Sequence, residues 1–525
     1  MRRRADRAEA AHPPMLVLTV LGLLLTVATA AGPVSAAALN QAPAKAAPPA
    51  ATSPAASAAP AASGAETGAP PADPRTLTYA PLKIAFPKPE RVFLPDGLLV
   101  YLFEDHELPL IDATIYFKAG SIFDPADKAG LADLAATLMR TGGTEAMAPA
   151  ALDEALEFMA AQIDLNASAD MLSGSVSVVK DRFPEALRIF ASILKSPRFD
   201  PERLEVEKAR ALEDIRRRYD DPGDLAELEF RKLVYGATSP WARLASVESI
   251  GRIKRDDLAE WQRRYVHPNN AVMGVAGDFD AKKMKALLEE TFRGWSNAKV
   301  TPPMVTKVRD DIPAGIHLVS RPLSQTQIEV GHLGVGRFDP DKFAIKILNF
   351  ILGEGGFTSR LVKEVRSTRG LAYSIGGGIG LDSDRGLFQI SGSTKAGSTV
   401  EAIDLIRTIL RQMRDPGPTE QEVKEAKESS INAFVFSVDG TAPYMRAFLF
   451  YDFYGYPPDY LQTYRDNLSR VTREQVTNAA RKRLNPDRLV ILVVGNDQGF
   501  DRPLSSLGLG EPRPLKLEET PAAAR

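Results

Sequence analysis

The folded part of the chain carries an internal repeat of roughly 210 residues. The segments RRYVHPNNAVMGVAGDFD (263–280) and RKRLNPDRLVILVVGNDQ (481–498) share a basic helix end, an Asn/Pro turn, a buried strand, and then Gly with a polar residue. A chain that repeats a unit of this size is expected to fold as two similar halves. We expect these halves at 76–295 and 316–505, joined by the charged, Pro-containing linker 296–315.

The first half combines strand-like and helical patterns. Alternating β-branched and aromatic residues predict strands in LLVYLFED (98–105) and PLIDATIYFKAG (109–120). Helical periodicity follows, which favours an α+β fold built from two α/β sandwich halves, with helices packed on a mostly antiparallel sheet. Helices are expected at 128–141, 150–162, 182–195, 200–219 and 254–266, and further strands at 163–180 and 271–276.

The first 75 residues have the pattern of an export signal followed by a tether. Basic residues precede the apolar run MLVLTVLGLLLTVATAA (15–31) and small residues follow it, which predicts a bacterial signal peptide over 1–38. An uncleaved inner-membrane anchor is the alternative, because the run is near the short end of membrane-spanning length. We expect a disordered Ala/Pro-rich linker over 39–75 and a loose tail over 506–525. The protein is therefore expected to be periplasmic or secreted.

The composition excludes several kinds of chemistry. The chain has no cysteine, which removes disulfides, thiolate catalysis and iron–sulfur clusters. Its 65 basic and 67 acidic side chains give no charge excess that favours nucleic acid. Its five histidines include no pair with local ligand spacing, so we expect His106 and His267 to lie in turns without a metal role.

One helical segment, KAGLADLAATLMRTGGT (128–144), resembles a known metal-binding helix. Its apolar residues follow an amphipathic spacing that ends at a Gly-Gly pair. The segment is similar to the zinc helix of the pitrilysin-type metallopeptidases, the family of insulin-degrading enzyme and the mitochondrial processing peptidases. Active members carry H-x-x-E-H at this place, where two imidazoles bind zinc and the Glu acts as general base on zinc-bound water.

This chain departs from that motif at every functional position. Asp133 and Thr137 replace the two histidines, and Ala136 replaces the base. The family's third ligand, a Glu about 76 residues downstream, has a counterpart in Glu213. One Glu and one Asp without imidazole make a poor zinc site at neutral pH. The resemblance therefore implies no metal or cofactor in this chain, and no hydrolysis of peptides by the chain alone.

The segment ILGEGGFTSRLVKEVRSTRGLAYSIGGG (351–378) resembles the family's C-terminal signature. In active relatives an Arg, and a Tyr seven positions later, bind the carbonyl of the scissile peptide and stabilise the developing oxyanion. Arg366 and Tyr373 have this spacing. The resemblance implies that they act in trans, on a carbonyl that a partner's zinc polarises.

Other residues of the signature are expected to support this site. Gly355 and Gly356 form its glycine turn and are expected to contact the substrate. Arg360 and Arg369 are expected to pack or to form salt bridges rather than to act on the peptide.

The resemblance covers about residues 90–500 and implies half of a clamshell chamber. The leading hypothesis is an exported, zinc-less subunit that pairs with a zinc-bearing homologue. It would help to bind unfolded peptides and would touch a membrane only if its signal stays uncleaved. A non-catalytic scaffold or peptide-binding protein of the same fold is the alternative. A third interpretation is a peptidase with an unconventional metal site at Asp133 and Glu213.

Overall fold

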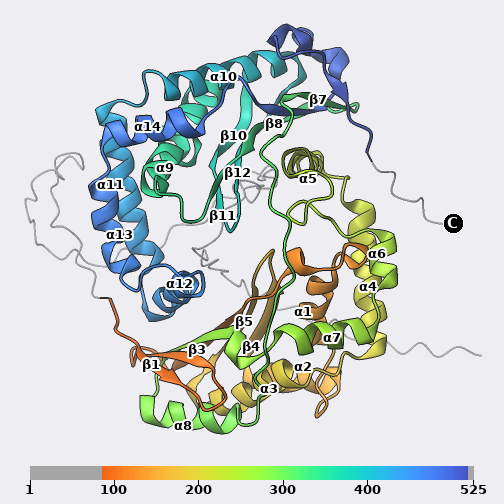
Figure 1. Ribbon diagram of the computed structural model, residues 1–525, viewed down its shortest axis with the longest axis vertical. Helices are drawn as coiled ribbons and strands as arrows, with labels where there is room; N and C mark the ends of the chain where they lie inside the picture. Colours follow the sequence, from red (N-terminus) through yellow and green to blue (C-terminus); the bar gives the residue numbers. More distant parts are fainter. Residues whose placement is uncertain (1–85, 518–525) are drawn as a thin grey trace, which may run out of the picture.

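The computed structural model describes residues 86–517, in which each of two six-stranded sheets carries most of the helices of its own half on one face (Figure 1). The expected α+β class is confirmed. The predicted signal peptide (1–38) and Ala/Pro-rich linker (39–75) lie outside the described residues, as does the end of the predicted tail. Within 86–517, no helix combines the length and the apolar composition needed to cross a membrane.

The first half is built on a sheet in which apolar side chains alternate toward the helices. In β5, Leu172, Gly174, Val176 and Val178 are buried, while the serines between them are partly exposed. The strand order is β1 (Glu90–Phe93), β2 (Leu99–Glu104), β6 (Ala271–Gly277), β3 (Leu110–Phe117), β5 (Leu172–Val179) and β4 (Gln162–Ala167). The helices of this half are α1 (Leu131–Thr141), α2 (Pro149–Met159), α3 (Phe183–Lys195), α4 (Pro201–Arg217), α5 (Pro222–Tyr235), α6 (Val247–Arg252), α7 (Arg255–Tyr265) and α8 (Ala281–Thr291).

The second half repeats this layout after an irregular connection that ends at Gly315. Its strand order is β10 (Ala372–Ile379), β12 (Leu387–Lys395), β8 (Gln325–Leu333), β13 (Val490–Gly495), β7 (Gly315–Ser320) and β14 (Arg513–Pro514), and β9 (Val335–Gly336) pairs separately with β11 (Leu381–Asp382). Its helices are α9 (Lys342–Asn349), α10 (Thr399–Arg414), α11 (Glu420–Ser437), α12 (Thr441–Phe453), α13 (Tyr460–Ser469) and α14 (Arg473–Arg483).

The two sheets have the same topology over five strands. The order β4-β5-β3-β6-β2 in the first sheet corresponds to β10-β12-β8-β13-β7 in the second. In each sheet the last pair of this series is parallel, β2 with β6 and β7 with β13, whereas the other three pairs are antiparallel. The sheets are therefore mixed, and their shared order explains the sequence repeat.

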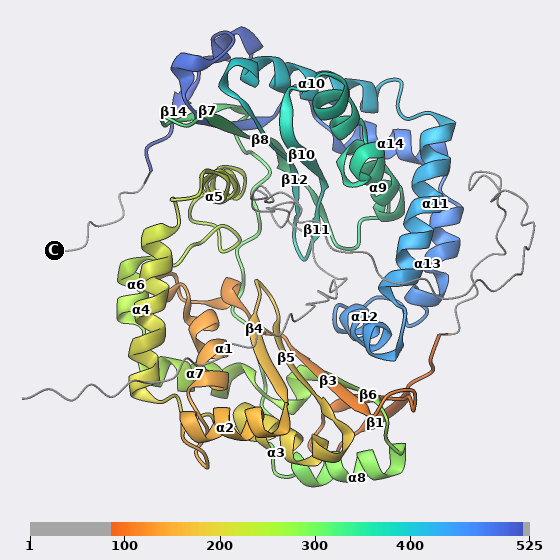
Figure 2. The same ribbon diagram turned by 180° about the vertical axis from the view of Figure 1, so that it is seen from behind.

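Each half covers part of the other half's sheet with one helix (Figures 1 and 2). Helix α5 of the first half packs on β8 and β13 of the second, where Phe230 is buried against Leu492. Helix α12 of the second half packs on β6 and β3 of the first, where Leu449 is buried against Phe103. The approach is close, because a Cβ atom at Gly274 of β6 would lie 2.7 Å from Leu449 Cδ1. The two halves therefore share their cores.

Two parts of the sequence-based layout need correction. Helix α5 had no predicted counterpart, although it begins with Asp221, whose side chain accepts hydrogen bonds from two backbone N–H groups of the first turn. The segment expected as a loose tail is ordered as far as residue 517. Its strand β14 extends the second sheet beside β7, and Leu515 N donates to Leu318 O at 2.8 Å. Leu515 and Leu517 also pack against the apolar cluster beneath α5, which explains the order.

Candidate functional site

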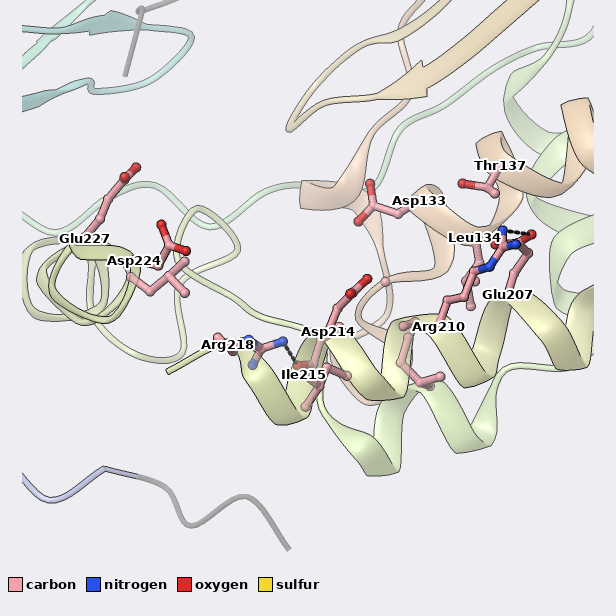
Figure 3. A pocket seen from close by; sticks show the side chains of 15 residues that line it. Asp133, Leu134, Thr137, Glu207, Arg210, Asp214, Ile215, Arg218, Asp224 and Glu227 are labelled. Carbon is pink, nitrogen blue, oxygen red and sulfur yellow. Dashed lines mark hydrogen bonds and ion pairs between the residues drawn. The ribbon is translucent and has the colours of Figure 1, made fainter. Parts of the chain in front are cut away.

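Asp133 and Thr137 lie one turn apart on α1 and line a cavity of about 550 Å³ between α1, α4 and α5 (Figure 3). The start of α1 is held by Asp124, whose buried carboxylate accepts hydrogen bonds from Gly130 N and Ala132 N at 3.1 Å. Burial raises the pKa of the Asp124 carboxyl to about 7. The surroundings of Asp133 likewise raise the pKa of its carboxyl, because they desolvate it.

Ala136 faces the other way, into the core. It is 2% exposed and packs within the apolar cluster of the first half. The position that corresponds to the general base is therefore a small core residue in this chain. A larger polar side chain there would be buried, at a cost in folding free energy.

Glu213 does not line the cavity. Its carboxylate is 46% exposed and is paired with Arg217 at 2.6 Å and with Arg216 at 3.5 Å. The hydrogen bond from Arg217 lowers the pKa of Glu213. The residue of α4 that faces Asp133 across the cavity is Asp214 (Figure 3). Sequence comparison selected the neighbouring residue, and helical spacing from the buried Glu207, two turns earlier, would have indicated Asp214.

The cavity wall carries charges of both signs. Glu207 is paired with Arg210 at 2.9 Å, and Arg218 donates to Ala245 O at 2.6 Å. Asp224 and Glu227 contribute carboxylates from α5 (Figure 3). Within the part of the chain that is described, Asp133 and Asp214 have neither a hydrogen bond nor an ion pair to another side chain.

The residues at this place do not fit the zinc ion of the active relatives. No imidazole lines the cavity. Among residues 86–517, no group of three or more His, Cys, Asp or Glu side chains is arranged to hold a metal ion. A hydroxyl and widely spread carboxylates are poor ligands for zinc. The arrangement does not support metal-assisted hydrolysis at Asp133 and Glu213.

Arg366 and Tyr373 lie on either side of the connection from a π-helix to the edge strand of the second sheet. Arg366 belongs to the π-helix η8 (Val362–Thr368), and its guanidinium lies 5.3 Å from the centre of the Phe357 ring. In the described region Arg366 has no ion-pair partner. Tyr373 is 70% exposed at a bulge of β10, where the pairing with β12 shifts between Ala372 and Ser374.

Both polar groups are therefore available to a ligand. The Tyr373 hydroxyl makes no hydrogen bond to another described residue. A guanidinium and a phenol are the donors that would stabilise a developing oxyanion. The exposed Phe357 ring beside Arg366, 73% accessible, adds an apolar contact that sequence comparison did not select.

The glycines of the signature have conformational roles. A Cβ atom at Gly353 would lie 2.4 Å from Gly377 O, so this glycine lets the π-helix η6 (Phe350–Glu354) approach β10. A Cβ atom at Gly355 would lie 2.6 Å from Phe350 O. Gly356 has a φ of +58° and faces open space. Contact of Gly355 and Gly356 with substrate stays a prediction.

The expected salt bridges of the signature are confirmed. Arg360 donates from two nitrogens to the two carboxylate oxygens of Glu422, each at 2.7 Å. Burial opposes ionisation of Glu422, but these hydrogen bonds outweigh it and lower its pKa to about 2. Arg369 lies 3.5 Å from Glu401 on the surface. Arg360 therefore stabilises the fold through its pair with Glu422, whereas Arg369 forms only a surface ion pair.

His106 and His267 each contact one or two oxygen atoms in exposed hydrogen bonds. His106 Nδ1 lies 2.7 Å from an Asp278 carboxylate oxygen, on an exposed turn. The ring nitrogens of His267 lie 2.9 and 2.6 Å from the carbonyl oxygens of Ser296 and Arg263.

The chain matches two models of one peptidase family. Residues 100–234 match the model described as insulinase, peptidase family M16, and residues 252–430 match the peptidase M16 inactive domain. This chain belongs to peptidase family M16.

Known relatives span most of both halves. An uncharacterized zinc protease of Mycobacterium leprae is 27% identical over 409 residues, which cover 75% of this chain and 89% of the relative. The non-peptidase homolog YmxG of Helicobacter pylori is 24% identical over 403 residues, or 75% and 90% of the two chains. The crystal structure of a peptidase M16 inactive domain from Pseudomonas fluorescens matches with a TM-score of 0.71 and 27% identity, over 82% of this chain and all of that one.

Proposed function

We propose that this chain is an exported, zinc-less subunit of a heteromeric M16 metallopeptidase. The observation that carries the proposal is an asymmetry between its two halves. The motif positions of the first half hold Asp133, Ala136 and Thr137, whereas the second half presents Arg366 and Tyr373 with their polar groups free. The relative from Helicobacter pylori that is named a non-peptidase homolog supports the first part of this asymmetry.

In this role the second half acts on the substrate and the partner supplies the metal. The Arg366 guanidinium and the Tyr373 hydroxyl donate hydrogen bonds to the carbonyl oxygen of the scissile peptide. These bonds strengthen as negative charge develops on that oxygen, so they lower the barrier to attack by water. The partner would be a zinc-bearing homologue of this chain, and zinc would be bound there.

Unfolded peptides are the substrates that the sheet edges favour. β4 is the terminal strand of the first sheet and pairs only with β5. Its side chains that point away from the helices are exposed and polar: Gln162, Asp164 and Asn166. A peptide that adds to this edge binds through main-chain hydrogen bonds, which makes the binding tolerant of sequence.

Export by the predicted signal peptide is part of the proposal. Fractionation of the native host, with N-terminal sequencing of the isolated chain, tests it. Recovery of a shortened chain from the periplasm or medium supports export and cleavage. A full-length chain in the membrane fraction supports the uncleaved anchor, and a cytoplasmic chain contradicts export.

The central experiment is coexpression with a zinc-bearing homologue from the same genome. We expect the two chains to copurify and the mixture to cleave unfolded peptides. Tyr373→Phe should lower kcat by about 100- to 1000-fold, because one oxyanion donor is lost. Arg369→Gln is the matched control, since Arg369 lies in an exposed salt bridge, and it should leave kcat unchanged. Failure of the chains to associate, or full activity of Tyr373→Phe, contradicts the proposal.

A further inference from the structure

The tip of the β4–β5 hairpin, residues 168–171, is held by both halves of the chain. On its own side, Ser121 N donates to Ser168 O and Ile122 N donates to Ala169 O, both at 3.0 Å. On the other side, the Asp170 side chain reaches three elements of the second half. A hairpin that ends the first sheet is therefore fixed to the second half at its tip.

Asp170 is the centre of this contact. Its Oδ1 accepts a hydrogen bond from the Tyr454 hydroxyl at 2.8 Å, and its Oδ2 accepts one from the Ser383 hydroxyl. Arg337 Nη2 lies 3.9 Å from Oδ2. Tyr454 follows α12, Ser383 follows β11 and Arg337 follows β9, so one carboxylate joins three separate segments.

Arg337 ties these segments to one another. Its guanidinium lies 3.6 Å from the centre of the Tyr454 ring, and it donates to Asp382 at 3.2 Å and to Ser383 at 3.1 Å. The side chains of Arg337 and Asp170 are 11% and 16% exposed. Because the cluster is largely removed from water, loss of the Asp170 charge would leave Arg337 without part of its compensation.

The cluster lies at the two-stranded β9–β11 sheet, whereas Tyr373 lies near the start of β10 in the six-stranded sheet. β11, whose end carries Ser383, lies between β10 and β12 in the chain, and β10 carries Tyr373. The opposite end of β4 is held within the first half, where Arg140 Nε donates to Ile163 O at 2.9 Å. The edge of β4 thus has one anchor in each half.

We propose that Asp170 is a positioning residue. Through Tyr454, Ser383 and Arg337 it fixes the tip of the β4–β5 hairpin to the second half, so that the free edge of β4 is held in one position for a peptide that adds to it. The peptide step of this inference rests on the proposed function. The anchoring of β4 does not, because it concerns the free chain.

Hydrogen exchange of the free, full chain tests the anchoring. In Asp170→Asn, amides of 162–167 and 172–179 should exchange at least about tenfold faster, because the hairpin opens more often. Amides of β7 and β13 should exchange as in the wild type. Asp181→Asn is the matched control, because this exposed carboxylate follows the other end of β5 and is absent from the cluster. It should leave the hairpin unchanged.

Affinity for a fluorescein-labelled unstructured peptide tests the positioning. Asp170→Asn should raise Kd by at least about fivefold, because the edge is no longer preorganised, and Asp181→Asn should not. Ser383→Ala removes the hydroxyl that donates to Asp170 and accepts from Arg337, two hydrogen bonds, but keeps the charges, so it provides a milder variant if Asp170→Asn fails to fold. It should show the same pattern with smaller changes.

The possible outcomes separate this inference from the proposed function. Unchanged hairpin exchange in Asp170→Asn overturns the anchoring, whatever happens to peptide binding. Faster exchange with unchanged Kd overturns the positioning role and leaves the proposed function standing. A wild-type chain that binds no peptide contradicts the proposed function and the peptide step, while the exchange data still decide whether Asp170 anchors β4.

Discussion

Glu213 and Asp214 are neighbours in α4, yet their carboxylates have different surroundings. Glu213 is ion-paired with Arg217 at 2.6 Å on the surface, whereas Asp214 faces Asp133 across the cavity (Figure 3). Successive residues of a helix point about 100° apart. A shift of one position along α4 therefore decides which carboxylate matches the family's third metal ligand. Glu213 forms a surface salt bridge, whereas Asp214 lines the cavity together with Asp133.

A partly restored zinc motif distinguishes these two residues. In Asp133→His/Thr137→His, two imidazoles at i and i+4 would share the cavity with Asp214, and we expect zinc to bind with one-to-one stoichiometry in calorimetry. Adding Asp214→Asn should weaken zinc binding by at least about tenfold, because a third ligand is lost. Adding Glu213→Gln is the control and should have no effect. The opposite ranking would show that Glu213 is the nearer ligand.

Substitution of Leu449 tests whether α12 of the second half stabilises the first half by packing on its sheet. This side chain of α12 is fully buried on the first sheet, so Leu449→Ala should lower the free energy of unfolding by about 2–5 kcal/mol. Because each half covers part of the other, urea unfolding should stay a single transition by both circular dichroism and tryptophan fluorescence. Phe436→Ala, at a 72% exposed position in α11, should cost less than about 0.5 kcal/mol. Separate transitions for the two halves would contradict a shared core.

The raised pKa of Glu329 predicts that the folded chain loses stability as the pH rises. Burial within β8 raises the pKa of its carboxyl to about 8, although Ser391 and Gln389 donate hydrogen bonds that oppose this. The pKa of Glu329 is therefore higher in the folded chain than in the unfolded chain. The stability that the protonated carboxyl contributes is complete below about pH 4.5 and is lost as the pH rises to about 8.

The Glu329→Gln variant isolates this effect. Gln cannot ionise, so the variant should gain stability relative to the wild type between pH 5 and pH 8, by about 2–4 kcal/mol in total. Urea unfolding of both chains across this range provides the measurement. A difference that stays constant with pH would show that Glu329 is not the responsible group.

The lowered pKa of Glu422 predicts that the folded chain loses stability as the pH falls into the acidic range. Arg360 holds its folded pKa at about 2, below the ordinary value of 4.5, so the pair stabilises the fold above about pH 4.5 and loses this effect as the pH falls toward 2. Glu422→Gln should cost about 1–3 kcal/mol at pH 7 and much less at pH 3. Glu425→Gln, one turn further along α11, is the control. An equal loss from Glu422→Gln at both pH values would exclude the ion pair as the cause.

Much of the local structure could be predicted from sequence. The predicted helix at 182–195 coincides with α3 (Phe183–Lys195), because its apolar residues repeat at the helical period and Pro184 marks its first turn. The strand at 271–276 matches β6 (Ala271–Gly277) for a similar reason, a short apolar run between turns. Patterns of this kind are local, so no knowledge of distant contacts was needed.

The relations between distant segments could not be predicted. Helix α5 buries Leu225 and Phe230 on a sheet whose strands begin at Gly315, and nothing near α5 in the sequence indicates that surface. The Asp170 cluster likewise joins residues more than 160 positions apart. The family signature placed Arg366 and Tyr373 on the chain, but the bulge at Tyr373 depends on how β10 pairs with β12.

The mutual covering of the sheets by α5 and α12 bears on how such a chain could arise. A single repeat unit would leave exposed the apolar sheet surface that a helix of the other half covers in this chain. The stable state of a half-length ancestor would then be a domain-swapped homodimer, in which two copies lend each other one helix. Joining the copies in one gene replaces that bimolecular association by an intramolecular one at high effective concentration. Either copy could afterwards lose its catalytic residues and still be needed, because its helix covers the sheet of the other copy.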